Sequence, residues 1–164
     1  MNSQNNLKTR ILFILLVGLA PYWLMNATVW IPWVYLSRTI GIIIMVMFVP
    51  ILWGYSAYYC YKHTPYDNWK KERWLISILF LLSSSISDIF FFLIWRHLPL
   101  SELYHPTTLA SYALFVIIPF IVEPIASILY RKEKFKLCLK YNWTGLALFS
   151  LIFIIITLYC VRFW

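Results

Sequence analysis

Two carboxylates, Asp88 and Glu123, lie inside long apolar runs of this 164-residue chain. A charged side chain at the middle of a bilayer costs roughly 2.5–3.5 kcal/mol on insertion scales, so each should face protein or water, or stay protonated. Ser84 and Ser87 recur with Asp88 at helical spacing and form one polar stripe, which is at minimum a helix-packing surface. These four residues are candidates for intramembrane polar chemistry, such as the handling of a proton or an ion.

Prolines surround the second of these carboxylates. Pro119 and Pro124 flank Glu123 and remove two backbone donors, so this segment is expected to kink or to unwind locally. Ion-coupled transporters use discontinuous helices with a carboxylate. The plain alternative is a proline-kinked packing helix whose Glu123 bonds to a nearby hydroxyl. At ~1.5 Å per residue, Asp88 should lie about 10 Å from the outer end of its span and Glu123 about 10 Å from the inner end of its own, which permits a staggered relay but disfavours a direct carboxyl pair.

A second group of chemistry-bearing side chains stands between the third and fourth apolar runs: Arg96, His97, Glu102 and His105. Glu102 and His105 are three positions apart, so one helical turn would put them on the same side, as in metal-binding Glu-x-x-His units. Zinc needs at least three protein ligands and only His97 is near, so neither a metal nor a cofactor is expected. A His and a Glu here could act as general acid and base on a lipid headgroup. The plain alternative is a solvated interfacial turn.

The elements that must position these groups are apolar runs of about 20 residues, which is the length that spans a bilayer as a helix. Every backbone N–H and C=O must find a partner within lipid, and uninterrupted stretches such as 151–156 lack the alternation of a membrane β-barrel. We therefore predict an all-α fold, a polytopic membrane helix bundle that forms one integral membrane domain over residues 1–164. Its spans are expected at about 11–28, 39–60, 74–95, 109–130 and 143–161.

The composition excludes a water-soluble globule. The chain is 62% hydrophobic, 20% aromatic and 12% charged, whereas an ordinary soluble domain is roughly 25% charged. The sequence motifs of nucleotide-binding loops, serine hydrolases and zinc hydrolases are missing. A haem between the spans would need histidines within the bilayer, and none of the three lies there. These observations argue against most membrane enzymes driven by a nucleotide or a cofactor.

The basic residues predict the orientation, because Lys and Arg near span ends are retained on the cytoplasmic side. Basic residues gather in the amino-terminal tail, after the second span and after the fourth, and only Arg38, Arg96 and Arg162 lie on the other side. Five crossings with a cytoplasmic amino terminus and an outer carboxyl terminus satisfy this distribution. The sequence thus predicts a multi-pass protein of the plasma or inner membrane.

The net charge of +8 is concentrated in these flanking segments. Its expected partners are therefore the anionic headgroups of the inner leaflet rather than nucleic acid. The predicted headgroup contacts are Arg131, Lys132, Lys134, Lys136 and Lys140.

Three functions remain open. The first, which we favour, is a non-catalytic accessory, partner-binding or immunity-type membrane protein that associates with another membrane protein or with itself. The second is a small proton- or ion-coupled transporter that uses Asp88 and Glu123. The third is a lipid-modifying enzyme at the outer leaflet that uses His97, Glu102 and His105.

Overall fold

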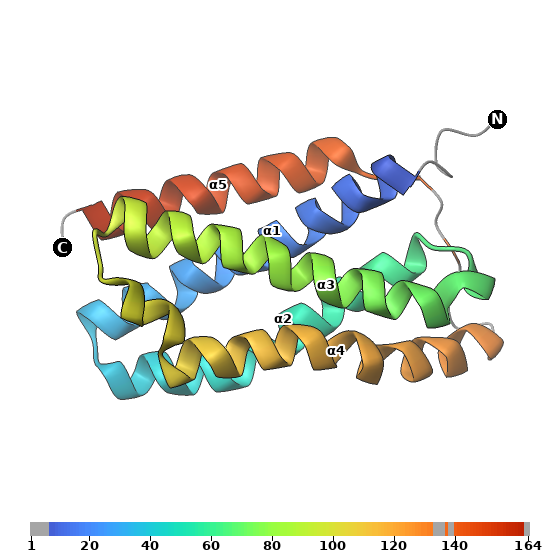
Figure 1. The fold of residues 1–164 in the computed structure, drawn as a ribbon, viewed down its shortest axis with the longest axis horizontal. Coiled ribbons are helices and arrows are strands. Elements are labelled where there is room, and N and C mark those ends of the chain that lie inside the picture. The colour runs from blue at the N-terminus through green and yellow to red at the C-terminus, as the bar shows by residue number, and fades with distance from the viewer. Residues whose placement is uncertain (1–6, 133–136, 138–139, 163–164) are drawn as a thin grey trace.

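A computed structural model of the chain describes residues 7–132, 137 and 140–162. These residues form an all-helical bundle without strands, and five helices are long and apolar enough to span a membrane. The predicted fold class is therefore confirmed. The helices are α1 (Leu7–Tyr35), α2 (Arg38–Lys62), α3 (Trp69–Asp88), α4 (Pro106–Arg131) and α5 (Trp143–Arg162), as Figure 1 shows.

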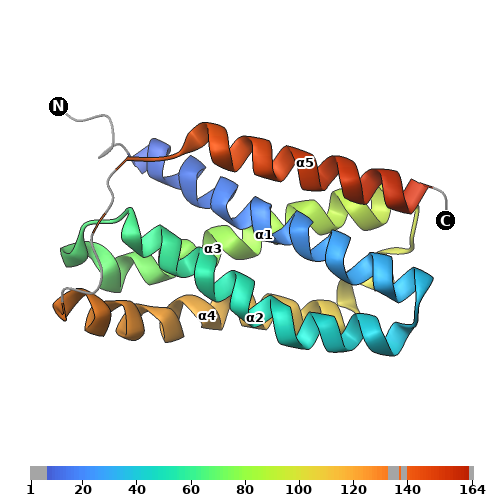
Figure 2. The ribbon, with the colours of Figure 1, turned by 180° about the vertical axis from the view of Figure 1, so that it is seen from behind.

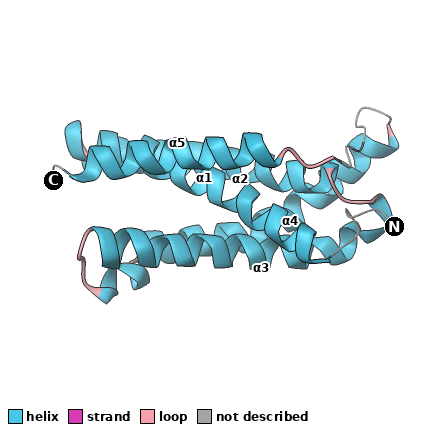
Figure 3. Cartoon of the chain, turned by 90° about the horizontal axis from the view of Figure 1, so that it is seen from above, coloured by secondary structure: helices cyan, strands magenta, loops and turns pink. Residues whose placement is uncertain are grey.

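The helices pack in two layers, with α5, α1 and α2 in one and α3 and α4 in the other (Figures 2 and 3). Helix α1 contacts α2, α3 and α5, while α4 packs against α2 and α3. Helix α5 packs mainly on α1 and exposes Leu148, Leu151, Ile152 and Ile155 on its outer side. Such an apolar exposed face is typical of a helix that contacts lipid.

The helices run lengthwise between two ends of the bundle (Figure 1), and these ends differ in charge. We call the end at which α1, α3 and α5 begin the amino-terminal end, and the opposite one the cavity end. The connection between α1 and α2 at the cavity end is short, since α1 ends at Tyr35 and α2 begins at Arg38. The Ser37 side chain accepts a hydrogen bond from the backbone N–H of Ile40 and so caps α2. The amino-terminal end carries the basic residues Lys8, Arg10, Lys62, Lys70, Lys71, Arg73, Arg131, Lys132 and Lys140.

The middle of the bundle is an aromatic layer. The ring of Trp53 lies 4.1 Å from that of Phe115 and 4.9 Å from that of Phe80, measured between centroids. These side chains come from α2, α4 and α3, and all three are buried. Aromatic side chains bury the largest apolar areas, so this layer is a main source of packing energy between the two layers of helices.

The segment around Pro119 and Pro124 was expected to kink or to unwind locally. The unwinding is wrong, because α4 is α-helical from Pro106 to Arg131, and the kink stays a prediction. Hydroxyl groups of the neighbouring helices bond to the backbone of this segment. Tyr61 donates to the carbonyl of Pro119 and Ser77 donates to the carbonyl of Val116, each over 2.9 Å. Pro119 and Pro124 remove the donors to the carbonyls of Phe115 and Phe120, so these hydroxyls add hydrogen bonds to other carbonyls of the same segment.

Helix α3 changes geometry directly after Asp88. Residues Ile89–Trp95 continue the span as a π-helix, which was not expected from the sequence. A π-helical turn rotates the following side chains relative to an α-helix, and such turns are frequent at functional sites. The segment ends at Arg96, after which His97 adopts a positive φ of 52°.

Candidate functional site

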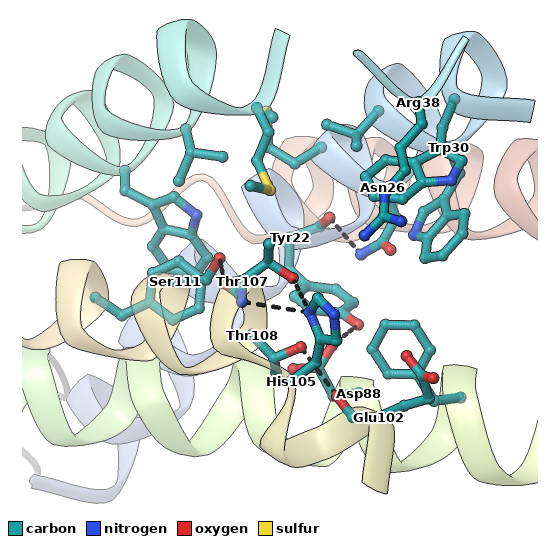
Figure 4. A pocket seen from close by; sticks show the side chains of 18 residues that line it. Tyr22, Asn26, Trp30, Arg38, Asp88, Glu102, His105, Thr107, Thr108 and Ser111 are labelled. Atoms are coloured by element: carbon teal, nitrogen blue, oxygen red, sulfur yellow. Dashed lines mark hydrogen bonds between the residues drawn. The ribbon is translucent and has the colours of Figure 1, made fainter. Parts of the chain in front are cut away.

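A cavity of about 410 Å³ opens between α1, α2, α3 and α4 at the cavity end of the bundle (Figure 4). Its apolar wall is formed by aromatic and Met or Val side chains, among them Trp30, Trp33, Trp53, Phe92 and Phe115. Its polar lining consists of Tyr22, Asn26, Arg38, Asp88, Glu102, His105, Thr107, Thr108 and Ser111. A cavity that combines apolar walls with a few convergent polar groups is the usual form of a small-molecule site.

Asp88 is buried at one wall of this cavity, with 7% of its surface exposed. Its Oδ1 accepts a hydrogen bond of 2.5 Å from Tyr22 in α1, and its Oδ2 accepts one of 2.7 Å from Tyr112 in α4. One carboxyl group therefore joins three helices. A carboxylate has about four acceptor positions, so two donors leave capacity for a further partner on the cavity side.

The serines of the polar stripe share the buried face of Asp88. Ser87 donates to the carbonyl of Ser83 over 2.8 Å, which satisfies its hydroxyl within the helix. Ser84 is fully buried, and its Oγ has no hydrogen-bond partner among the described residues. Neither serine lines the cavity. The structure thus brings Asp88 to the cavity and leaves Ser84 and Ser87 in the helix packing.

Two arginines lie over tryptophan rings at the cavity end. The guanidinium carbon of Arg38 is 5.3 Å from the centroid of Trp33, and that of Arg96 is 4.5 Å from the centroid of Trp30. Figure 4 shows Arg38 reaching toward Asn26 at the cavity. Within the described part of the chain, Arg38 has no ion-pair partner. Partial burial lowers the pKa of Arg96, while the charge of Glu102 raises it less.

Glu102 and His105 lie close together in the same cavity wall. Glu102 belongs to a 3-10 helix, Leu100–Tyr104, and His105 caps α4, where its Nδ1 accepts from the backbone N–H of Thr107 over 3.4 Å. The same Nδ1 lies 2.8 Å from the hydroxyl oxygen of Thr107. His97 is exposed and does not line the cavity. The predicted group of four is therefore divided, with Glu102 and His105 at the cavity, and Arg96 and His97 outside its lining.

Glu123 lies toward the other end of the bundle and is paired. Its Oε2 is 3.7 Å from a guanidinium nitrogen of Arg73 in α3, and Arg73 also lies over the ring of Phe120 at 5.1 Å. The packing-helix alternative predicts a hydroxyl partner for Glu123, whereas the partner in the structure is Arg73. A second pair, Arg10 with Glu72, joins α1 to α3 at the same end, and Glu72 is buried with its Oε1 unpartnered among the described residues.

The aromatic layer separates the two intramembrane carboxylates. Along α3, Phe80 lies between Arg73, which holds Glu123, and Asp88. The fifteen positions from Arg73 to Asp88 correspond to about 22 Å along a helix. A proton relay between Asp88 and Glu123 would have to cross the packed rings of Trp53, Phe80 and Phe115.

Three of the predicted headgroup contacts, Arg131, Lys132 and Lys140, are among the described residues and lie at the amino-terminal end. Arg131 and Lys132 are exposed, and Arg131 Nε donates to the hydroxyl of Tyr66 over 3.1 Å. Lys140 is exposed as well. Lys134 and Lys136 lie outside the described residues. The Arg131 contact anchors the end of α4, so this side chain has a structural partner in addition to any headgroup.

Sequence reasoning missed Tyr22 and Tyr112, the two donors to Asp88, and Arg38 as a cavity residue. Tyrosines in apolar runs have no local signature, because their partners lie far away in the chain. It also missed Glu72, although an acid among Lys70, Lys71 and Arg73 beside a span is a detectable signal. Within the described ranges, no group of three or more His, Cys, Asp and Glu side chains is placed to hold a metal ion.

Comparison of the chain with models of protein families, with curated proteins and with solved structures finds no match.

Proposed function

We propose that this protein is a non-catalytic accessory protein of the membrane that holds a small amphiphilic molecule in the cavity at the end of its bundle. The observation that carries this proposal is the cavity of about 410 Å³ whose walls are apolar and whose lining includes both a guanidinium and carboxylates. Sites for small molecules occupy about 300–1,000 Å³ and combine apolar walls with few polar groups. An amphiphile satisfies both kinds of surface at once.

The charge distribution supports an orientation with the amino-terminal end in the cytoplasm. Lys and Arg are concentrated at that end, whereas the cavity end carries Arg38, Arg96 and Arg162. In this orientation the cavity lies in the outer half of a plasma or inner membrane. An occupant would enter from the outer leaflet or from the outer solution, and another membrane protein would receive it or sense it there.

The test is whether the cavity retains an amphiphile through purification. Protein extracted in a mild detergent is analysed by native mass spectrometry, and one bound amphiphile per chain is expected. Ser111→Phe places a ring in the cavity and is expected to remove that molecule. The matched control is Ser101→Phe, because Ser101 is exposed on the 3-10 helix and outside the cavity lining.

Thermal unfolding of each variant shows that it is folded before binding is compared. A bound molecule in wild type and in Ser101→Phe, with none in folded Ser111→Phe, supports the proposal. Equal occupancy of wild type and folded Ser111→Phe, or no bound amphiphile in wild type even after addition of total membrane lipids, overturns it.

A second candidate, a lipid-modifying enzyme, is favoured by one contact. The Nδ1 of His105 lies 2.8 Å from the hydroxyl of Thr107, and both residues line the cavity with Glu102. A hydroxyl beside an imidazole is the arrangement of a nucleophile and its base. If this candidate is right, lipid incubated with wild type changes mass and lipid incubated with His105→Gln does not.

A further inference from the structure

We propose that the amphiphile carries a phosphate diester and a primary ammonium group, the phosphoethanolamine group found in membrane phospholipids and in soluble glycerophosphoethanolamine. This inference rests on the proposed function and names the ligand of that same cavity. It follows from two opposite charges that line one cavity, Arg38 and Glu102, neither of which forms an ion pair within 4.0 Å in the described part of the chain. The charge of Arg96 acts on Glu102 from outside the cavity lining, without such a contact.

The anionic part of the ligand is assigned to Arg38. Its guanidinium lies over the ring of Trp33 at 5.3 Å, which holds the side chain in place. A planar guanidinium matches a phosphate with two parallel hydrogen bonds. Asn26 adds an amide beside it: one N–H of Nδ2 donates to the carbonyl of Tyr22 over 3.1 Å, and the second N–H is a donor of the kind that a phosphate oxygen accepts.

The cationic part is assigned to Glu102, with Asp88 as a further acceptor. The Glu102 side chain takes part in neither of the ion pairs among the described residues. The hydrogen bonds of Glu102 are made by its backbone: the N–H donates to the carbonyl of Pro99, and the carbonyl accepts from the N–H of His105 and the hydroxyl of Thr108. Asp88 has two tyrosine donors and retains acceptor positions. An ammonium group has three donors, so it can serve both carboxylates and one hydroxyl such as that of Ser111.

A primary ammonium fits better than a quaternary one. Quaternary ammonium groups are held by open aromatic faces. Here Trp30 has Arg96 over its ring and Trp33 has Arg38 over its ring, at 4.5 and 5.3 Å. Trp53 packs against Phe80 in a T-shaped contact and against Phe115 in a tilted one. Carboxylate acceptors are therefore more accessible to a cation here than aromatic faces are.

The apolar wall gives the remainder of the ligand its place. The cavity is lined beside the tryptophans by Met25, Met45 and Val49. On its outer side, α2 exposes Ile43, Val46 and Met47. The two sources of the headgroup differ in their need for this wall. A phospholipid would use it for the first segments of its chains, and soluble glycerophosphoethanolamine would not.

The test is a titration of delipidated protein in detergent, followed by native mass spectrometry. The probes are dioleoyl-phosphatidylethanolamine, dioleoyl-phosphatidylglycerol, which lacks the ammonium, and dioleoyl-phosphatidylcholine, which has a quaternary one. The ethanolamine lipid should bind at least about tenfold more tightly than the other two, the equivalent of one charge-assisted hydrogen bond. Glycerophosphoethanolamine is the soluble probe, and binding within tenfold of the lipid identifies the soluble source, whereas weaker binding identifies the lipid.

Two variants separate the roles of the charges. Glu102→Gln should weaken the binding of the ethanolamine lipid about tenfold and leave the binding of the glycerol lipid unchanged, because only the ammonium loses its partner. Arg38→Gln should weaken the binding of both lipids by a similar factor. Arg38→Lys keeps a positive charge and should retain part of the affinity that Arg38→Gln loses. The control is Asp67→Asn, which removes an exposed charge at the other end of the bundle and should change neither affinity.

The outcomes distinguish this inference from the proposed function. Equal binding of the three lipids, or a Glu102→Gln variant that is folded and keeps the ethanolamine preference, overturns the headgroup assignment. The proposed function then still stands if Ser111→Phe removes the bound molecule. Loss of any lipid binding by wild type overturns both.

Discussion

The hydroxyl of Tyr22 lies 2.5 Å from Oδ1 of Asp88, and this hydrogen bond joins α1 to α3 across 66 positions of the chain. Tyr112 in α4 occupies the other oxygen at 2.7 Å. A carboxyl group is costly on a helix face that contacts lipid. Asp88 instead lies where α1, α3 and α4 meet. The carboxyl group is stabilised by its two donors, and it in turn holds these helices at the wall of the cavity.

The first prediction concerns these donors. Tyr22→Phe and Tyr112→Phe should each lower the free energy of unfolding by about 1–3 kcal/mol, because each leaves a buried acceptor with one donor fewer. The loss is measured as a shift of the unfolding curve in mixed micelles of mild detergent and dodecyl sulfate. The double variant should lose more than the sum of the two, since the last donor has then gone.

Tyr104→Phe is the control for this experiment, because Tyr104 is 66% exposed on the 3-10 helix Leu100–Tyr104. It should unfold like wild type. An additive double variant would show that the two tyrosines act independently, contrary to the shared carboxylate that the structure describes.

The second prediction compares the ion pairs at the amino-terminal end. Arg10→Gln leaves Glu72, whose side chain is 4% exposed, without its partner, and should cost about 3 kcal/mol of unfolding free energy. Arg73→Gln leaves Glu123, which is 14% exposed and paired over 3.7 Å with an Arg73 side chain that is 33% exposed. Its cost should be about 1 kcal/mol, because solvent screens that pair.

The order of these two losses is the measured quantity. Adding Glu72→Gln to Arg10→Gln should recover part of the stability, since an unpaired buried charge is then removed. A larger loss for Arg73→Gln than for Arg10→Gln would contradict the assignment of Arg10–Glu72 as the buried pair.

The third prediction concerns the close approach of α1 to α3. A Cβ at Gly18 would lie 2.6 Å from Oγ of Ser83 and 3.1 Å from a ring carbon of Phe80. Gly18→Ala should therefore destabilise the bundle by about 1–3 kcal/mol, as expected for overpacking. Gly54→Ala is the matched control, because its Cβ would have Val122 as nearest neighbour at 4.0 Å. That variant should be unchanged or more stable by about 0.5–1 kcal/mol, the gain expected from Ala in a helix. Both are read from the same unfolding curves, and equal stability of the two alanine variants would contradict the packing at Gly18.

The helices were predictable because their cause is local. A run of about 20 apolar residues can satisfy its backbone in lipid only as a helix. The exact ends of the helices were not predictable. Helix α1 continues through Trp30 and Trp33 to Tyr35, because aromatic side chains suit both the membrane and its interface. The π-helix after Asp88 had no sequence signal either, because its geometry depends on the packing of the helices around it.

The candidate site was predictable in part, for a similar reason. Asp88, Glu102 and His105 stood out as polar groups in unusual places, and the structure brings them to one cavity. The other cavity residues, Tyr22 and Arg38, did not stand out in the sequence. They become significant only when α1 and α2 are placed beside α3 and α4. The hydroxyls of α2 and α3 that bond to the carbonyls of Pro119 and Val116 likewise have no signal in the sequence. Side-chain partners between distant helices are the information that one sequence lacks.

The fourth prediction concerns orientation. Cysteine placed at Tyr104, which is 66% exposed at the cavity end, should react with a membrane-impermeant maleimide in intact cells. Cysteine placed at Lys132, exposed at the other end, should react only after the cells are opened. The native cysteines are replaced by serine beforehand. Labelling in the reverse order would place the cavity in the inner half of the membrane.

The fifth prediction concerns His63, which is buried directly after α2 with 5% of its surface exposed. Its Nδ1 donates to the carbonyl of Tyr59 over 2.9 Å, and its ring packs on Phe13 and Tyr141 at centroid distances of 5.0 and 5.9 Å. Burial lowers the pKa of His63, and hydrogen bonds to the backbone of Tyr59 and Lys140 offset this in part, while the charge of Lys62 adds to it.

The sign of the pH effect follows from this lowered pKa. In the unfolded chain the imidazole takes up a proton near pH 6.5, whereas in the folded protein it does so at a lower pH. Between the two values the unfolded state binds more protons, so the stability contributed above pH 6.5 is lost as the pH falls through the folded pKa. Unfolding curves of wild type and His63→Phe at pH 8, 6.5 and 5 measure this difference. The free energy of unfolding of wild type should fall more steeply than that of the variant over this range, and His97→Gln, which changes an exposed histidine, should follow wild type. Parallel curves for wild type and His63→Phe would show that the buried imidazole does not govern this part of the pH dependence.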